Sequence, residues 1–135
     1  MELVVDTNII ISAMLTTGKT QELLFNKSLR FYAPDYLLAE LSKYRELIKE
    51  KTGFDDREFE KALSLVTQKI NVIAFEEYDK YRKTAFEAVS DKKDWPFIAL
   101  ALSTKCSLWS NDKKLAEQKI VPVLNTKELI ELIES

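Results

Sequence analysis

The chain has 135 residues, of which 46% are hydrophobic and 31% are charged, a composition typical of a globular domain that buries its own core. Its 20 Lys and Arg against 22 Asp and Glu give a formal net charge of −2, which argues against a broadly basic nucleic-acid binder but leaves room for a local basic patch. The chain has no histidine and only one cysteine, Cys106, which excludes Ser-His-Asp and Cys-His catalysis, most zinc sites and a disulfide framework.

The apolar stretches of the sequence are short. Residues 3–5 are too few for a secretion signal, and residues 97–102 are far too few to span a membrane. Together with the single cysteine, these stretches predict a cytoplasmic protein with no membrane association. No linker, repeat or low-complexity tract interrupts the sequence, so residues 1–135 are expected to form one domain.

Short β-branched segments alternate along the chain with longer segments of helical periodicity. In chain order, strands are expected at residues 3–5, 30–33, 71–75, 107–110 and 120–123. Helices are expected at residues 8–15, 19–28, 34–51, 55–69, 76–90, 95–104, 113–118 and 126–134. This alternation predicts an α/β fold of three layers, with a central parallel sheet of four to five strands and helices on both faces.

Four acidic residues are expected at one edge of that sheet. Asp6 directly follows the first strand and Asp112 follows the fourth, so both stand at carboxyl ends of parallel strands, where ligands bind in such folds. Glu40 lies on the apolar side of the third predicted helix, and Asp94 begins the sixth, one turn after Asp91. The structural alternative is that Asp6, Asp94 and Asp112 cap helices. In the same reading, Glu40 only borders its apolar stripe.

Convergence of four acids favours a binding site, because helix capping does not require the acids to gather at one edge. Two carboxylates about 5–6 Å apart repel by about 3 kcal/mol at an effective dielectric constant of about 20. Four such groups would therefore take up protons or hold a cation. Oxygen ligands without imidazole or thiolate select Mg²⁺ or Mn²⁺, and such an ion suits hydrolysis of phosphodiester bonds.

The segments around these acids also form a recognisable series. Residues 4–8 are a strand that ends in Asp, with an amide residue two positions later, and residues 91–101 and 108–112 surround Asp94 and Asp112 at an 18-residue spacing. In order and spacing, these segments resemble the motifs of the PIN-domain nucleases, and among them the VapC-type toxins and their archaeal relatives. Glu40 stands where that family has its helical acid. The resemblance covers nearly the whole chain.

The resemblance implies a Mg²⁺- or Mn²⁺-dependent ribonuclease. In it Asp6, Asp94 and Asp112 would bind metal, and Glu40 would bind metal or orient a water molecule. It leaves open whether Asp91 is also a ligand and whether one or two ions bind. The residues that would support the acids or the phosphate by hydrogen bonds are Asn8, Ser110 and Asn111.

Two pairs of lysines flank two of the acids and would guide the phosphate backbone of RNA: Lys92, Lys93, Lys113 and Lys114. The alternative is that they form ordinary solvated surface. Trp95 and Trp109 are expected in the core. VapC-type proteins pair with an antitoxin and many form homodimers, so the resemblance implies both partners.

Three other functions stay open at this stage. The first is an RNA-processing nuclease of the same fold outside a toxin pair. The second is a phosphoaspartyl phosphatase, which also begins with a strand ending in Asp-Thr but carries a second Asp where this chain has Asn8. The third is a non-catalytic module that docks RNA or protein.

Overall fold

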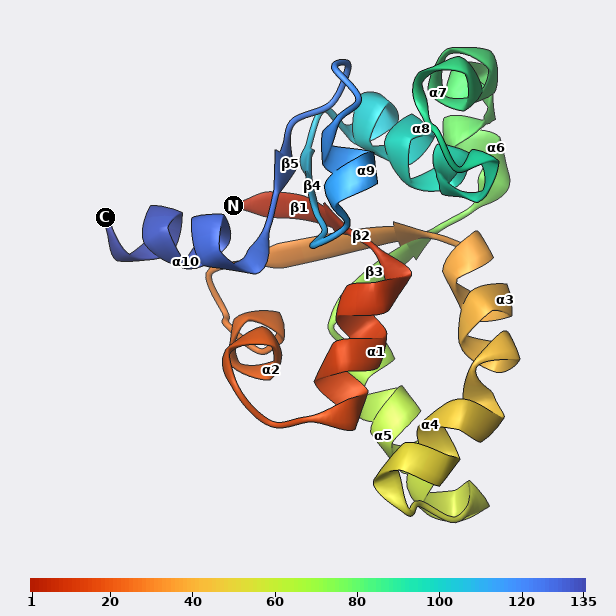
Figure 1. Cartoon of the computed structure of the whole chain (residues 1–135), viewed down its shortest axis with the longest axis vertical. Coiled ribbons are helices and arrows are strands. Elements are labelled where there is room, and N and C mark those ends of the chain that lie inside the picture. Colours follow the sequence, from red (N-terminus) through yellow and green to blue (C-terminus); the bar gives the residue numbers. More distant parts are fainter.

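The computed structural model describes residues 1–135 and is built on a five-stranded parallel sheet between two layers of helices (Figure 1). The strands lie in the order β3-β2-β1-β4-β5, so the first strand of the chain is the central one. Their bounds are β1 (Glu2–Val5), β2 (Arg30–Pro34), β3 (Ile70–Ile73), β4 (Ser107–Trp109) and β5 (Val123–Leu124). The expected three-layer α/β fold with a parallel sheet is confirmed.

Five helices cover one face of the sheet: α1 (Thr7–Leu15), α2 (Lys19–Leu24), α3 (Tyr36–Lys43), α4 (Arg45–Thr52) and α5 (Asp56–Thr67). Three others cover the opposite face: α6 (Phe75–Tyr78), α7 (Arg82–Ala88) and α8 (Trp95–Thr104). Two short 3₁₀ helices, η1 (Asp79–Tyr81) and η2 (Lys92–Asp94), lie beside α7 and α8, and α9 (Lys113–Ala116) and α10 (Thr126–Glu134) complete the chain. None of these helices is both long and apolar enough to span a bilayer.

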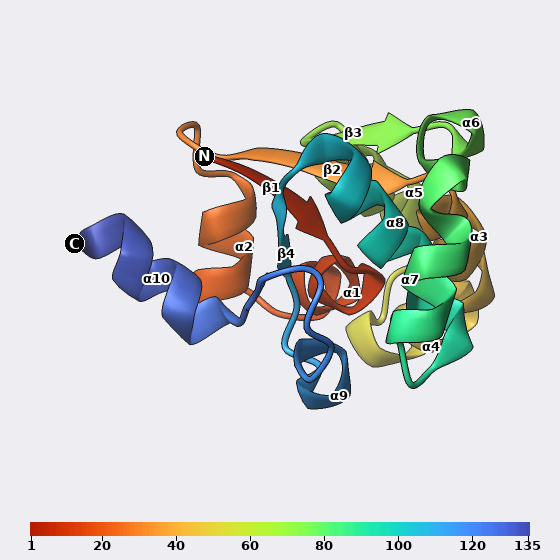
Figure 2. The same ribbon diagram turned by 90° about the horizontal axis from the view of Figure 1, so that it is seen from above.

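The side chains of the central strands alternate between the two layers. Leu3 and Val5 of β1 pack on the side of α1, whereas Val4 packs on the side of α8. In β4, Trp109 and Leu108 divide between the two sides in the same way. Because both faces are buried, a shift of register by one residue would exchange the two sets, so the carboxyl ends of β1 and β4 are fixed relative to each other. At those ends, β1 leads into α1 and β4 leads toward α9 (Figure 2).

Two expected helices are interrupted in the structure. The one predicted at 34–51 divides into α3 and α4 at Tyr44, whose backbone leaves the helical region at φ −95° and ψ 5°. Pro34 belongs to β2 instead, opposite Ile73. The helix predicted at 76–90 consists of α6, η1 and α7.

Two other expected elements are shorter than predicted. The expected helix 19–28 ends at Leu24, and Asn26 then forms a turn by accepting a hydrogen bond from the Ser28 backbone. The fifth strand begins at Val123, after a proline that has no N–H for the ladder. Before it, the side-chain oxygen of Gln118 accepts hydrogen bonds from the N–H groups of residues 120 and 121, which removes them from strand pairing.

Candidate active site

Asp6 lies where β1 passes into α1. Its Oδ1 accepts hydrogen bonds from the backbone N–H groups of Asn8 at 2.6 Å and Ile9 at 3.3 Å, so the side chain caps α1. Its Oδ2 accepts a hydrogen bond from the hydroxyl of Ser110. Only 6% of the residue is exposed, and this burial raises the pKa of the carboxyl, with the charge of Asp112 as a smaller cause and the hydrogen bonds acting in the opposite direction.

Asp112 lies beyond the end of β4 and caps α9. Its Oδ1 accepts hydrogen bonds from the backbone N–H groups of Lys114 at 2.9 Å and Leu115 at 3.2 Å. Its own N–H donates to the hydroxyl oxygen of Ser110 at 3.1 Å, so this buried serine connects Asp112 with Asp6. The capping role expected for both aspartates is therefore present, and Oδ2 of Asp112 has no hydrogen bond.

Glu40 projects from α3 toward the start of α1. Its Oε1 accepts a hydrogen bond of 2.5 Å from the hydroxyl of Thr7, a residue that is only 5% exposed. Partial burial raises the pKa of the Glu40 carboxyl, and the charge of Asp6 adds to that shift. Thr7 is a site residue that sequence reasoning missed. Its position beside Asp6 at the end of a strand was the available signal.

Asp94 differs from the other acids because its carboxylate makes no hydrogen bond. The expected cap of α8 is not formed by its side chain: its backbone is helical, at φ −85° and ψ −7°. Pro96 at the second helical position offers no N–H to a capping side chain, and the carboxylate of Asp94 does not accept from the N–H of Phe97 at the third position either. Burial raises the pKa of Asp94 to about 7, and the charges of Asp91, Asp112, Asp6 and Glu40 contribute further.

One pocket of about 160 Å³, which we call the acid pocket, brings these groups together. Its lining residues are Asp6, Thr7, Asn8, Glu40, Tyr44, Asp91, Lys93, Asp94, Phe97 and Asp112. The four acids expected at one edge thus face the same space, together with Asp91. Their donor set is all carboxylate, which is the type that Mg²⁺ and Mn²⁺ prefer. As they stand, no three acidic side chains are arranged to hold an ion, so binding would require rotation of side chains.

The expected supporting residues divide between this pocket and other parts of the fold. Asn8 lines the pocket and reaches Asp6 through its backbone N–H. Asp91 lines it too, and its carboxylate accepts a hydrogen bond of 3.0 Å from the Lys93 backbone. The side chain of Asn111 instead exchanges hydrogen bonds with Thr126 at the start of α10, at 3.0 and 2.8 Å.

Of the four expected lysines, only Lys93 lines the acid pocket. The ammonium of Lys92 donates to the backbone carbonyls of Phe86 at 2.8 Å and Val89 at 2.9 Å, a structural role. Lys113 and Lys114 are exposed in the first turn of α9, which Asp112 caps. Of the four expected lysines, one therefore supplies positive charge next to the acids, which agrees with the net charge of −2 of the chain.

Several solved structures share this fold. A chain of VapBC2 from Rickettsia felis, in complex with a DNA fragment from the promoter, superposes with a TM-score of 0.70 at 18% identity over 93% of this chain and 98% of that one. PAE2754 from Pyrobaculum aerophilum superposes with a TM-score of 0.72 at 14% identity, over 100% of this chain and 91% of that one. A chain of VapBC-1 from nontypeable Haemophilus influenzae superposes with a TM-score of 0.56 at 18% identity, over 94% of this chain and 99% of that one.

Because these structures share at most 18% identity with this chain, their similarity shows the fold alone. The family follows from comparison of sequences. No curated protein matches the sequence. Residues 4–131, however, match the sequence profile of the PIN domain. That match spans both the central sheet and all of the acids of the acid pocket. The chain therefore belongs to the PIN-domain family.

Proposed function

We propose that the chain is a single-domain, Mg²⁺- or Mn²⁺-dependent endoribonuclease, the toxin of a toxin–antitoxin pair, in which Asp6, Glu40, Asp94 and Asp112 are the catalytic acids. One observation carries the proposal: these acids come from four separate segments and line one pocket. Capping explains Asp6 and Asp112 but neither of the others, because the carboxylates of Glu40 and Asp94 cap no helix. A carboxyl with its pKa raised to about 7 is a costly feature that a merely structural site would not need.

The metal would be held by Asp6, Asp94 and Asp112, with Glu40 beside it. When bound, a divalent ion activates water and neutralises charge that develops on the phosphodiester. The protein holds Asp6 through Ser110 and two backbone N–H groups, and it leaves Oδ2 of Asp112 free. Asp94 has no hydrogen bond to break, so its carboxylate turns toward an ion at the lowest cost.

Two residues of the chain position the groups that would meet the substrate. Thr7 donates to one oxygen of Glu40 and leaves the other oxygen to accept a proton or orient a water molecule. Lys93, at the mouth of the acid pocket, makes no ion pair with a carboxylate and supplies positive charge for the phosphate backbone of RNA.

An antitoxin is the proposed protein partner, and chains of VapBC structures among the proteins of similar fold support it. A homodimer and a cytoplasmic location belong to the same proposal. An RNA-processing nuclease would use the same acids, so the identity of the neighbouring gene separates these two roles: a short DNA-binding protein encoded immediately upstream supports the toxin.

The test is cleavage of RNA with Mn²⁺ or Mg²⁺, with and without a chelator, by the wild type and by matched variants. Glu40→Gln and Asp6→Asn are expected to lose at least 100-fold in kcat/KM, a loss typical of groups that act in the transition state. Glu50→Gln is the control, because this glutamate is exposed on α4 and makes no ion pair. Cleavage that survives both the chelator and Asp6→Asn would contradict the proposal.

The phosphatase alternative is less compatible with the sequence, because such an enzyme carries a second Asp where this chain has Asn8. Incubation with a phosphate mimic such as beryllofluoride tests this directly. A stable adduct on Asp6 would favour the phosphatase.

A further inference from the structure

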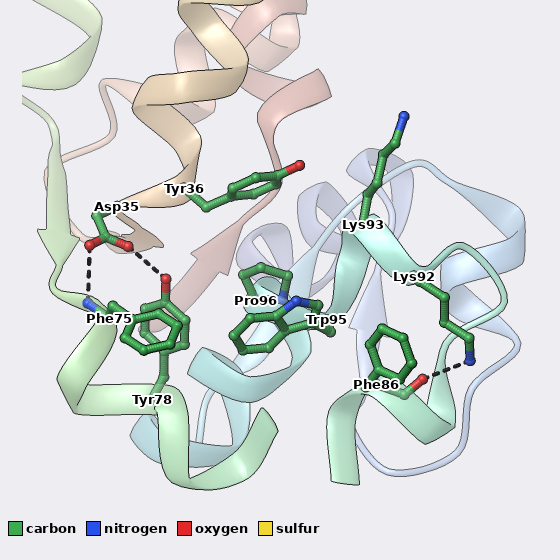
Figure 3. A pocket seen from close by; sticks show the side chains of 9 residues that line it. All are labelled: Asp35, Tyr36, Phe75, Tyr78, Phe86, Lys92, Lys93, Trp95 and Pro96. Atoms are coloured by element: carbon green, nitrogen blue, oxygen red, sulfur yellow. Dashed lines mark hydrogen bonds between the residues drawn. The ribbon is translucent and has the colours of Figure 1, made fainter. Parts of the chain in front are cut away.

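A second and larger pocket, of about 600 Å³, adjoins the acid pocket (Figure 3). We call it the aromatic pocket. Residues at the start of α3 and in α6, α7, η2 and α8 line it: Asp35, Tyr36, Phe75, Tyr78, Phe86, Lys92, Lys93, Trp95 and Pro96. The proposed catalytic function uses none of the rings in this set.

The two pockets are neighbours, because Lys93 lines both. In Figure 3, Lys93 extends away from the rings, on the side to which the Tyr36 hydroxyl points. Glu40, Asp91 and Asp94 of the acid pocket are close enough to Tyr36 for their charges to contribute, after burial, to the raised pKa of its hydroxyl. A chain molecule that enters the acid pocket can therefore continue into the aromatic pocket past Lys93.

The walls of the aromatic pocket are held in place before any ligand binds. Asp35 accepts hydrogen bonds from the Phe75 backbone at 3.0 Å and from the Tyr78 hydroxyl at 2.6 Å, which fixes the floor. On the other side, Lys92 holds the end of α7 by donating to the Phe86 carbonyl. A ligand would therefore lose little of its binding free energy to ordering of the walls.

Apolar ring surface is left open in this rigid frame. Phe75 is 36% exposed and Phe86 is 42% exposed. The guanidinium of Arg82 lies over the Trp95 ring, 5.1 Å from its centre, and the ammonium of Lys92 lies over the Phe86 ring, 4.9 Å from its centre. The accessible rings that no cation covers are therefore those of Tyr36 and Phe75, and Phe86 offers the part of its surface that Lys92 leaves exposed. The neighbouring ammonium group of Lys93 forms no ion pair.

We propose that the aromatic pocket binds one unpaired nucleobase of the RNA strand, adjacent to the phosphodiester bond in the acid pocket, with Lys93 on the intervening phosphate. This inference rests on the proposed nuclease function. A base offers a flat face that stacks on aromatic side chains, and each phosphodiester of RNA has a base on either side. The negative phosphate complements Lys93, and a base within a duplex could not enter, so the pocket selects single-stranded segments.

The experiment combines two protein variants with altered RNA. Phe75→Leu and Phe86→Leu remove aromatic faces but keep apolar volume at exposed positions. Phe25→Leu is the matched control: it is 37% exposed, at the end of α2, and has the ammonium of Lys69 5.6 Å from its ring, much as Phe86 has that of Lys92 at 4.9 Å. The substrates are an RNA oligonucleotide with one cleavage site, copies with one abasic nucleotide at each flanking position, and a copy that is abasic at both flanking positions.

Wild type and Phe25→Leu are expected to lose about ten-fold in kcat/KM when the base is missing at one flanking position. The pocket variants should cleave intact RNA about ten-fold more slowly and show no further loss on the abasic copy. Cleavage of the copy that is abasic at both flanking positions should be equal in all of them. Equal cleavage of intact and abasic RNA by the wild type, or discrimination retained by the pocket variants, would overturn the proposal. A pocket that binds a protein and no base would give one of these two results.

Binding measurements keep the inference separate from the nuclease proposal. Fluorescence anisotropy with the same labelled oligonucleotides, on the wild type with the chelator, reports base recognition without cleavage. If the nuclease proposal fails, none of the RNA substrates is cleaved with Mn²⁺, while an affinity difference of about ten-fold between intact and abasic RNA still supports the pocket. If only the pocket fails, cleavage persists and that affinity difference is absent.

Discussion

The hydroxyl of Ser110 donates a hydrogen bond to the carboxylate of Asp6, 104 residues away in the chain. The same oxygen accepts from the Asp112 backbone N–H, so one buried serine links two of the acids that face the acid pocket. The contact depends on the parallel pairing of β1 with β4, in which Val5 lies opposite Trp109. Formation of the sheet and formation of the site are therefore a single event.

Replacement of this serine should therefore destabilise the protein. Ser110→Ala leaves Oδ2 of Asp6 buried without its donor, and we expect the free energy of unfolding to fall by about 1–3 kcal/mol. The pKa of Asp6 should rise further, because the Ser110 hydrogen bond lowers it. Urea denaturation at pH 7 measures the change. Ser12→Ala, at an exposed position of α1, is the control, and an equal loss in both variants would contradict this role for Ser110.

Asp94 should lower the stability of the metal-free protein at neutral pH. Its pKa of about 7 in the folded state lies above the ordinary 3.8, so the folded protein binds more protons and loses stability as the pH rises from about 4 to 7. Asp94→Asn removes that loss. With a chelator present, the variant should have a higher Tm than the wild type at pH 8 and a smaller advantage at pH 5. An advantage that does not change with pH would show that ionisation of the Asp94 carboxyl is not its cause.

Divalent ions should reverse the order of the two Tm values, so that the wild type becomes more stable than Asp94→Asn. Binding of Mn²⁺ to the folded state alone raises stability with ion concentration, so the Tm of the wild type should increase through a Mn²⁺ titration. Asp94→Asn should respond much less, because it lacks a proposed ligand and much of the repulsion that an ion would relieve. Differential scanning fluorimetry, with Ca²⁺ and Na⁺ as ion controls, checks this. Equal shifts for both proteins would argue against Asp94 as a ligand.

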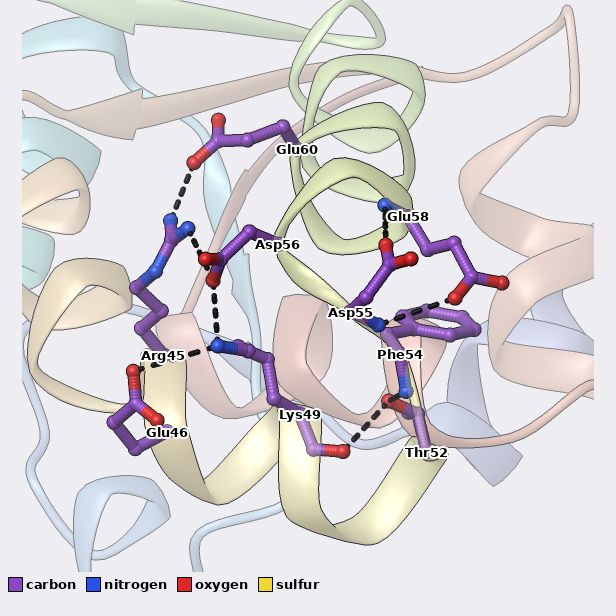
Figure 4. A network of polar contacts seen from close by, with 9 residues as sticks. All are labelled: Arg45, Glu46, Lys49, Thr52, Phe54, Asp55, Asp56, Glu58 and Glu60. Carbon is purple, nitrogen blue, oxygen red and sulfur yellow. Dashed lines mark hydrogen bonds and ion pairs between the residues drawn. The ribbon is translucent and has the colours of Figure 1, made fainter.

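The ion pairs between α4 and α5 should contribute much less to stability (Figure 4). Asp56 contacts Lys49 at 2.5 Å and Arg45 at 3.1 Å, and these cations lower its pKa, although 72% of its side chain is exposed. A lowered carboxyl pKa stabilises the fold above pH 4 and loses that effect as the pH falls further. Asp56→Asn should lower the Tm slightly at low salt and not at all in 1 M salt. A large loss that persists in 1 M salt would contradict this.

The acid edge was predictable because it depends on short-range signals. Asp6 and Asp112 each follow an apolar strand directly, and parallel strands bring their carboxyl ends to one edge whatever the loops between them do. The capping role expected of Asp94 was wrong, because its backbone is helical and its carboxylate accepts no hydrogen bond from the start of α8. The side-chain partner of Asn111 was not predictable, since it depends on how α10 packs after β5.

The aromatic pocket could not be predicted from the sequence for a different reason. Its rings come from α3, α6, α7 and α8, and no common period relates them. Their meeting depends on the breaks that divide the expected helix 76–90 into α6, η1 and α7. Trp109 is buried as expected, whereas Trp95 is only partly buried and lines the pocket. Periodicity indicates which side of a helix is buried, but not which ring of another helix a residue contacts.

The central position of β1 also determines when the acid pocket can form during synthesis. The strand emerges first from the ribosome, yet one of its two neighbours, β4, lies more than 100 residues later. Until Ser107–Trp109 and the residues after them are translated, Asp6 has no serine donor and the sheet has an open edge. Over most of its length, a nascent chain therefore lacks the link through Ser110 that joins Asp6 to Asp112.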